Sequence, residues 1–262
     1  MISGVADIAS HEFLQQEFAR RGPWLTRYRI GDQEYGGHLD YWRDPRLALF
    51  AQAFPHARAI LELGSLEGGH SFELARRPGV ERVVAIEGRE DNAERARFVK
   101  GVLGLSHVQI IVANLETYPL APLGRFDVVF CSGLLYHLPR PWFLLERIAG
   151  VSDHLFIWTH YATDRMMSTG WRRLAKRLLG RRVGYTFQES GLDDPLSGMS
   201  ATSFWPTLDG LRRMLAHAGF TEQHVLNLEP QHPHTGPAIT LAASKGSRPK
   251  RLLARPDPRC HE

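Results

Sequence analysis

Glycines and carboxylates gather at two places where apolar segments of the chain end. Residues 62–69 read ELGSLEGG and follow an apolar run, and glycines at such a place allow a sharp turn and a close approach of the backbone to a ligand. Glu87 ends a second apolar run, 23 residues after Gly64. This spacing is near the ~20 residues at which an acidic side chain accepts hydrogen bonds from ribose hydroxyls. The two places together predict a nucleoside site.

The first loop argues against a nucleotide phosphate as the ligand. A dinucleotide site needs a glycine at the position of Leu66, so that pyrophosphate can touch the backbone, and Glu67 would repel a phosphate. These surroundings suit a ligand with ribose and adenine but no phosphate, and S-adenosylmethionine (SAM) is such a ligand. The glycines would alternatively serve only a tight turn, but a loop between a strand and a helix with Glu87 downstream favours a cofactor site.

Apolar segments alternate with helical ones from residue 59 onward. Segments typical of buried strands cover residues 59–64, 82–87, 107–112, 126–131, 154–159, 223–228 and 238–243, and helical segments cover 70–77, 91–104, 141–149 and 207–220. Strands that are apolar on both faces and alternate with helices favour a parallel sheet covered on both sides. The last two strands are joined by a short Pro- and Gly-rich turn, which favours an antiparallel pair. We therefore predict an α/β fold with a doubly wound, mostly parallel seven-stranded sheet and an antiparallel last strand.

The remaining segments of the 262 residues surround this pattern. We expect a helical N-terminal cap in residues 1–50, a cofactor-binding domain in 51–244 with an irregular lid insert at 161–206, and a basic, flexible tail in 245–262. The tail has six basic and two acidic residues, which accounts for the whole formal charge of +4. A neutral body with a basic tail is only weak evidence for an anionic partner.

The composition also bears on compartment and metal content. No apolar run approaches the ~20 residues that span a bilayer, no signal peptide is visible, and the only cysteines are Cys131 and Cys260. Few cysteines fit a reducing compartment, so we expect a cytoplasmic protein without a membrane span. The 13 histidines lack metal-ligand spacing, since His232 and His234 flank a proline in a predicted turn without thiolates or carboxylates. No metal site is predicted.

Four segments resemble, in order, the motifs of class I SAM-dependent methyltransferases, and the resemblance covers residues 51–244. LELGSLEGG resembles the first motif, VVAIEGR the second and ANLETY the third. FDVVFCSGLLYHLPRP resembles the fourth strand and the following loop in the broad group that includes the tRNA wobble-uridine carboxymethyltransferases. The resemblance implies a Rossmann-like fold and SAM as the cofactor.

The resemblance also implies which residues contact SAM. Glu62 would steer the methionine end, Glu87 would take the ribose hydroxyls, and Gly88 would leave room for adenine. Cys131 would lie under the methionine at the end of the fourth strand. The predicted cofactor-binding residues are Glu62, Gly64, Ser65, Leu66, Gly68, Glu87, Gly88, Asn114, Leu115, Cys131 and Ser132.

Methyl transfer is an in-line displacement on a carbon that the sulfonium already activates, so the protein mainly aligns the reactants and excludes water. An acceptor that must lose a proton also needs a base. His137 in LLYHLP is the first candidate, because an unperturbed histidine exchanges protons near neutral pH. His160 in WTHYA is the second candidate. Each histidine would alternatively only order its loop or cap a helix.

Three functions stay open on the sequence. In the first, a methyl group passes to oxygen or nitrogen of a small molecule, in a pocket formed by residues 1–50, the loop after Cys131 and the insert. In the second, the acceptor is RNA such as tRNA, the group is methyl or carboxymethyl, and the basic segment 165–182 tracks phosphates rather than forming a lid helix. In the third, Leu66 marks a non-catalytic scaffold. Aromatic side chains that suit a planar acceptor or base stacking, but equally a core, are Trp24, Tyr41, Trp42, Tyr136, Trp142, Trp158, Trp171 and Trp205.

Overall fold

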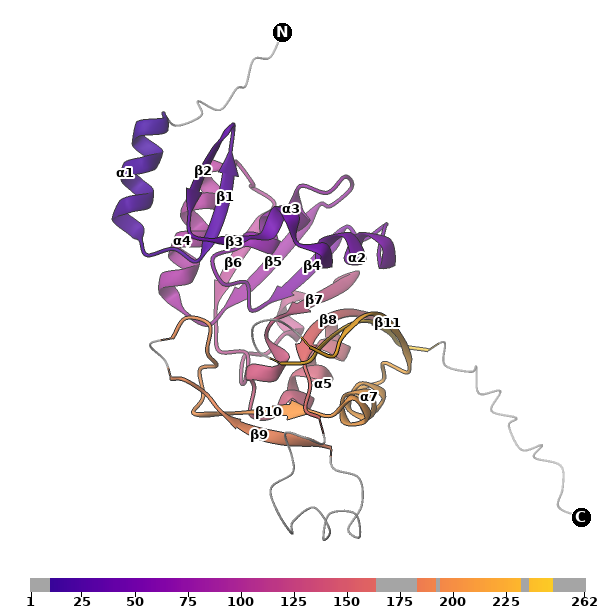
Figure 1. Ribbon diagram of the computed structural model, residues 1–262. Coiled ribbons are helices and arrows are strands. Elements are labelled where there is room, and N and C mark those ends of the chain that lie inside the picture. Colours follow the sequence, from indigo (N-terminus) through magenta and orange to yellow (C-terminus); the bar gives the residue numbers. More distant parts are fainter. Residues whose placement is uncertain (1–9, 164–182, 192–193, 232–235, 247–262) are drawn as a thin grey trace, which may run out of the picture.

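The computed structural model describes residues 10–163, 183–191, 194–231 and 236–246 (Figure 1). The predicted basic helix at 165–182, the residues around His232 and His234, and most of the predicted tail lie outside these ranges. No helix in the described ranges is long and apolar enough to cross a membrane.

The predicted sheet is confirmed, with seven strands in the order β11-β12-β8-β7-β4-β5-β6. Strands β4 to β8 run parallel, whereas β12 is antiparallel to both of its neighbours, β8 and β11. The strands are β4 (Ala59–Leu63), β5 (Arg82–Glu87), β6 (Val108–Val112), β7 (Val128–Ser132), β8 (His154–His160), β11 (Glu222–Glu229) and β12 (Ala238–Ser244). The chain builds β5 and β6 on one side of β4 and then crosses to β7 on the other. The order of strands therefore reverses beside β4, where ligands bind in open α/β sheets.

Helices cover both faces of this sheet (Figure 1). Alternate residues of β7 point to opposite faces, so Val129 packs in one core cluster and Phe130 in the other. The first cluster contains α5 (Pro141–Val151) and α7 (Leu208–His217), and the second contains α2 (Pro45–Ala53), α3 (Gly69–Ala75) and α4 (Glu90–Val102). Thr207 caps α7 as predicted, because its side chain accepts from Gly210 N.

The N-terminal segment is not a purely helical cap, so that prediction was wrong in part. It contains α1 (His11–Arg21), a three-stranded sheet of β1 (Thr26–Ile30), β2 (Gln33–Gly36) and β3 (Leu39–Asp40), and the short helix η1 (Tyr41–Arg43). Burial alternates along β1, where Thr26, Tyr28 and Ile30 face inward. Gly31 turns the chain at a φ of 64°. The two-residue period, rather than the aromatic content, was the informative signal.

The insert after β8 is also more regular than predicted. Strands β9 (Gly184–Gln188) and β10 (Thr202–Pro206) form a two-stranded antiparallel sheet. Four of the five β9 residues are exposed, so this strand lacks the alternation that marks a half-buried strand in a sequence. Two short helices, η2 (Ala121–Leu123) and η3 (Leu135–His137), flank β7 in the chain, and η3 directly follows it.

Candidate functional site

A cavity of about 870 Å³ lies at the carboxyl ends of the parallel strands. Its wall is formed by the residues that directly follow β4, β5, β6 and β7 and by the end of β8. The N-terminal segment around η1 and the insert from β9 to β10 also contribute to the wall. Small-molecule sites typically measure ~300–1,000 Å³. The cavity therefore has room for a cofactor and a small acceptor together.

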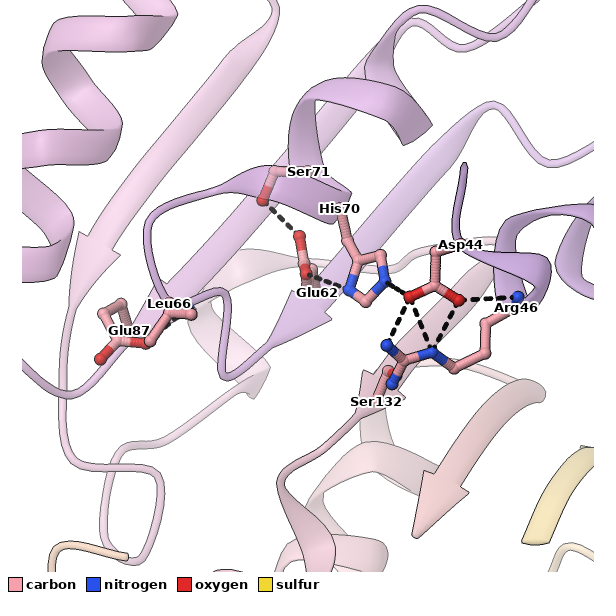
Figure 2. Close-up of polar contacts among 8 residues, drawn as sticks. All are labelled: Asp44, Arg46, Glu62, Leu66, His70, Ser71, Glu87 and Ser132. Atoms are coloured by element: carbon pink, nitrogen blue, oxygen red, sulfur yellow. Dashed lines mark hydrogen bonds and ion pairs between the residues drawn. The ribbon is translucent and has the colours of Figure 1, made fainter. Parts of the chain in front are cut away.

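The Glu87 carboxylate ties the tips of two neighbouring strands together. Glu87 is 5% exposed at the end of β5. Its Oε2 accepts from Leu66 N at 2.8 Å, and its Oε1 accepts from Arg89 N at 3.1 Å and from Asn92 Nδ2 at 3.2 Å. Burial raises the pKa of Glu87 above its ordinary value, and these donors oppose the rise. Figure 2 shows the contact with Leu66.

The loop after β4 keeps a glycine-like backbone although it contains a leucine. Leu66 has a φ of 50°, in the left-handed region that side chains rarely adopt. Such strain persists where surrounding contacts hold it, and the bond from Leu66 N to Glu87 is one such contact. Ser65 also lines the cavity, and its buried Oγ has no hydrogen-bond partner among the described residues. A buried polar atom without a partner fits a site that a polar ligand completes.

The insert approaches the β5 end of the cavity. A side chain at Gly88 would place its Cβ 2.2 Å from Met199 Sδ, so the missing side chain makes room for Met199. Arg89 Nη2 donates to the carbonyl oxygens of Asp194 and Ser197, each at 3.0 Å. These contacts hold residues 194–199 against the strand end that carries Glu87.

A second polar cluster lies at the other end of the cavity, beside β7 (Figure 2). Arg46 Nε donates to both oxygens of Asp44, at 2.8 and 2.9 Å, and Arg46 Nη1 donates to Ser132 Oγ at 2.9 Å. The Arg46 guanidinium also lies 4.7 Å from the centre of the Trp158 ring. His70 Nε2 lies 2.9 Å from Asp44 Oδ2. Bonds from His70 and Arg46 outweigh burial and hold the pKa of Asp44 well below its ordinary value.

Glu62 extends this cluster into the protein. It is 2% exposed, its Oε2 accepts from Ser71 Oγ, and its Oε1 lies 3.9 Å from His70 Nδ1. Burial raises the pKa of Glu62 to about 8, and burial lowers the pKa of His70 to about 4. Near neutral pH the pair is therefore mainly uncharged, and the charges of the cluster are those of Asp44 and Arg46.

The first predicted base has a carboxylate partner from the insert. His137 Nδ1 lies 3.1 Å from Glu189 Oε2, which also accepts from Gly198 N at 2.6 Å and from Ser197 Oγ at 2.8 Å. Burial alone would raise the pKa of Glu189, but the bond from His137 and the other donors lower it to about 2. Glu189 therefore carries a negative charge across the physiological pH range.

The second predicted base lies deeper in an aromatic wall. His160 is 1% exposed, and its Nδ1 donates to the carbonyl oxygen of Pro237 at 3.1 Å. Its ring stacks on Trp205 at 5.0 Å and meets Tyr136 edge-on at 4.5 Å. The ring of Phe187 also stacks on Trp205, with 5.0 Å between the two ring centres.

Most residues predicted from the motifs line the cavity. These are Gly64, Ser65, Leu66, Glu87, Gly88, Asn114, Leu115, Ser132, His137 and His160. Of the eight aromatic candidates, Tyr41, Tyr136, Trp158 and Trp205 line it. Trp24, Trp42 and Trp142 do not contribute to its wall, and Trp171 lies outside the described residues.

Three predicted residues do not contribute to the cavity wall. Glu62 is enclosed by Ser71 and His70. Gly68 is the N-cap residue before α3, with a φ of 85°, and a Cβ there would lie 2.6 Å from the Phe72 ring, so this glycine allows close packing. Cys131 is fully buried in the core, where burial raises the pKa of its thiol to about 12.

Other wall residues were not predicted from the sequence, notably Arg46, His70, Glu189 and Met199. For Arg46 a local signal existed, because Asp44 followed by proline is typical of a helix start, and Asp44 does cap α2. Glu189 and Met199 carry no local pattern that marks a site.

Comparisons with known proteins agree with this geometry. A family model described as "Methyltransferase domain" matches residues 61–153. The crystal structure of the N-terminal domain of EvdMO1 with SAH (S-adenosylhomocysteine) bound matches with a TM-score of 0.75 and 31% identity, over 91% of this chain and 98% of that one. In the crystal structure of EvdMO1 the match covers 93% of this chain but 50% of that one, with 30% identity and a TM-score of 0.65. Magnesium protoporphyrin IX methyltransferase (ChlM) from Synechocystis PCC 6803, with SAH bound, shares the fold at 15% identity and a TM-score of 0.52.

Two curated proteins named tRNA U34 carboxymethyltransferase are more distant in sequence. The one from Desulforapulum autotrophicum is 26% identical over 232 residues, which make up 85% of this chain and 63% of that protein. The one from Shewanella frigidimarina is 26% identical over 152 residues, 58% of this chain and 43% of that protein. The chain thus spans less than two thirds of the length of these relatives.

The predicted sheet is present, the strand tips form one cavity, and the match to the SAH-bound EvdMO1 domain extends over nearly all of that domain. The chain belongs to the class I SAM-dependent methyltransferases.

Proposed function

We propose that this enzyme transfers a methyl group from SAM to an oxygen or nitrogen atom of a small molecule. The observation that carries the proposal is the pairing of His137 with Glu189 in a cavity covered by the insert. A base held by a carboxylate suits an acceptor that must lose a proton. A covered cavity suits an acceptor small enough to be enclosed with the cofactor.

Residues at the strand tips would hold the cofactor. Glu87 lies where ribose hydroxyls are expected, Ser65 offers an unpartnered buried hydroxyl, and Gly88 with Met199 borders the space for adenine. When bound, SAM supplies a methyl group on a sulfonium, which departs as a neutral thioether. The protein aligns the acceptor with this group and excludes water.

His137 is the better supported of the two predicted bases. Glu189 is ionised and accepts a hydrogen bond from Nδ1–H of His137, which leaves Nε2 as the ring nitrogen that would take the proton of the acceptor. Glu189 then stabilises the imidazolium that forms. The His137 side chain is 18% exposed, whereas His160 is nearly buried against Trp205. His160 would therefore shape the acceptor end of the cavity.

The acceptor class is suggested by the wall and by one relative. Tyr136, Trp158 and Trp205 give the acceptor end an aromatic surface, which suits the apolar face of a ring. The EvdMO1 domain was also crystallised in the presence of SAH and D-fucose. Hydroxylated ring compounds, including sugars, are therefore the first acceptors to test.

An RNA acceptor is the second candidate, because the tRNA U34 carboxymethyltransferase match extends over 85% of this chain. In that case the transferred group is methyl or carboxymethyl, and binding to bulk tRNA falls steeply as salt rises. The scaffold alternative rested on Leu66. Its backbone takes the left-handed conformation and keeps the bond to Glu87, so the leucine does not remove the loop geometry.

One assay separates these candidates. The protein is incubated with SAM, or with carboxy-SAM, and either a panel of hydroxylated ring compounds and amines or bulk tRNA, and the SAH formed is measured. We expect SAH formation with a small molecule and loss of that activity in His137→Ala. Turnover with tRNA alone would replace the small-molecule proposal with the RNA proposal. Binding of SAM without turnover of any acceptor, in a panel that a related methyltransferase does turn over, would contradict both.

A further inference from the structure

We propose that the acceptor carries an aromatic substituent beside the ring that is methylated, and that this substituent stacks on Tyr185 of the insert. The inference rests on the proposed small-molecule function and deepens it, because it names the part of the acceptor that extends out of the cavity. It is carried by one face of the hairpin β9–β10, which continues from the cavity wall to the surface of the protein.

This face of the hairpin is aromatic from the cavity outward. Directly opposed residues of an antiparallel pair point to the same side, as do alternate residues of one strand. Trp205 pairs with Tyr185, and Phe187 follows Tyr185 by two positions, so the three side chains share one face. Trp205 is 5% exposed and lines the cavity, and Phe187 lines it with 37% exposed. Tyr185 is 38% exposed and does not contribute to the cavity wall. The aromatic face therefore begins inside the cavity and ends on the surface.

The hairpin has an inner strand and an outer strand. β10 lies against η3, where Phe204 N donates to the carbonyl oxygen of Leu138 at 2.9 Å, and β9 lies on the outer side of β10 (Figure 1). β9 leads directly to Glu189, the partner of His137. Tyr185 precedes Glu189 by four residues, ~13 Å along an extended strand. A single ring that reacts beside His137 does not cover Tyr185 at that distance, whereas a second ring linked to it extends that far.

The composition of the hairpin favours an uncharged aromatic occupant. Neither β9 nor β10 contains a charged residue, so a phosphate backbone would find no cation on these strands. Exposed apolar side chains that gather beside a cavity are typical of a binding surface. Aromatic rings stack favourably on other rings, and Tyr185 and Phe187 each leave part of a ring exposed.

Trp205 provides a second observation that points to a ligand where the cavity meets this face. His160 and Phe187 both stack on its indole at 5.0 Å, and its buried Nε1 has no hydrogen-bond partner among the described residues. Buried polar atoms of folded proteins are usually satisfied. An oxygen atom between the two rings of the acceptor would supply the missing partner. A hydroxylated ring joined through oxygen to an aromatic ring, as in an aryl glycoside, meets both requirements.

Matched glycosides test the inference. Phenyl and methyl β-glycosides of D-glucose and D-galactose differ only in the substituent, and calorimetry measures their affinities for the SAH-loaded protein. We expect the phenyl glycoside of at least one sugar to bind about 10-fold more tightly than its methyl counterpart, as expected for a stacking contact and the apolar area that it covers. Tyr185→Thr should abolish this difference, whereas Tyr185→Phe should keep it because the ring remains.

The matched control is Thr186→Ala, because Thr186 is an exposed neighbour on the opposite face of β9, and this variant should keep the difference. Equal affinities for phenyl and methyl glycosides in the native sequence would overturn the inference. An unchanged difference in Tyr185→Thr, or no binding of any glycoside, would also overturn it.

Two further ligands identify other occupants of the face. A larger gain for the octyl glycoside than for the phenyl glycoside would overturn the inference in favour of a lipid chain. Tyr185-dependent binding of a short single-stranded RNA, without a gain for the phenyl glycosides, would overturn it in favour of a nucleobase. Turnover is measured separately as SAH formed from SAM. Tyr185-dependent binding of the phenyl glycosides without turnover of any sugar would support the aromatic subsite and contradict only the proposed methyl transfer.

Discussion

His137 Nδ1 lies 3.1 Å from Glu189 Oε2, although the two residues are 52 positions apart in the chain. His137 ends the short helix after β7, and Glu189 follows β9 of the insert. Gly198 donates to the same carboxylate oxygen, and a Cβ at Gly198 would lie 2.6 Å from the carbonyl oxygen of His137. The close approach of the insert therefore supplies the partner of the proposed base.

His137→Ala should lower kcat by ~10²–10⁴, the usual contribution of a positioned acid or base, and leave SAH affinity unchanged. Glu189→Gln keeps the shape but removes the negative charge, so it should cause a smaller loss of kcat. Initial rates and calorimetry with SAH measure the two effects. A His160→Ala variant that loses more kcat than His137→Ala would assign the base to His160 instead.

Glu87→Ala should weaken SAM and SAH to a similar extent, ~10- to 100-fold, because it removes hydrogen bonds made to a carboxylate. The loss also leaves Leu66 N without its acceptor. Glu90→Ala is the matched control, since Glu90 is an exposed acid three positions further on. Titration calorimetry gives both affinities, and an unaffected Glu87→Ala protein would remove Glu87 from the cofactor site.

The cluster behind Arg46 should make the stability of the protein depend on pH. Burial raises the pKa of Glu62 from 4.5 to about 8, so the folded protein holds a proton that the unfolded chain releases above pH 4.5. Burial lowers the pKa of His70 from 6.5 to about 4, so the unfolded chain holds a proton that the folded protein lacks below pH 6.5. The two effects oppose each other between pH 4.5 and 6.5. From pH 6.5 to 8 only Glu62 of the two still differs in protonation between the folded and unfolded states, and its contribution to stability falls as the pH rises.

Glu62→Gln should abolish this falling limb, because glutamine does not titrate. Urea unfolding at pH 6.5 and pH 8 should show a larger loss of unfolding free energy in the native sequence than in the variant, by at most ~1.4 kcal/mol per pH unit for one proton. The same pH dependence in both proteins would show that Glu62 is ionised in the folded state.

Two glycine substitutions in helices should have opposite effects on stability. Gly69→Ala would place a Cβ 2.1 Å from Tyr41 Cδ2, and such overpacking costs ~1–3 kcal/mol, which exceeds the ~1 kcal/mol that alanine gains over glycine in a helix. Gly101→Ala meets nothing within 4 Å and should stabilise the protein by up to ~1 kcal/mol. Thermal unfolding of both variants tests the two predictions. A stabilising effect of Gly69→Ala would mean that the Tyr41 side chain moves aside without an energetic cost.

The central sheet was predictable because its strands are apolar on both faces. Val83 to Ile86, for example, are all buried in β5, and the acid that ends this strand reaches the cavity, as the motif spacing implied. The loop at 64–66 was predictable for the same reason, since it directly follows such a strand. The two ends of α7 were also predictable, because Thr207 is a typical N-cap residue and Gly219 a typical residue just after the end of a helix.

The remaining parts of the site depend on contacts between distant segments. Arg46 meets Ser132 across 86 positions, and His70 meets Asp44 across 26. Such pairs leave no periodic pattern in the sequence. Alternation of strand residues explains the misplaced Cys131, because its neighbour Ser132 faces the cavity while Cys131 faces the core.

The insert touches the molecule at both ends of the cavity, with Met199 over Gly88 and Glu189 beside His137. With the nucleoside beside Gly88 and the acceptor beside His137, as proposed above, both ligands would lie against the insert, so their binding free energies should not be independent. We expect the acceptor to bind more tightly to the SAH-loaded protein than to the empty one, and by reciprocity to slow the escape of the nucleoside.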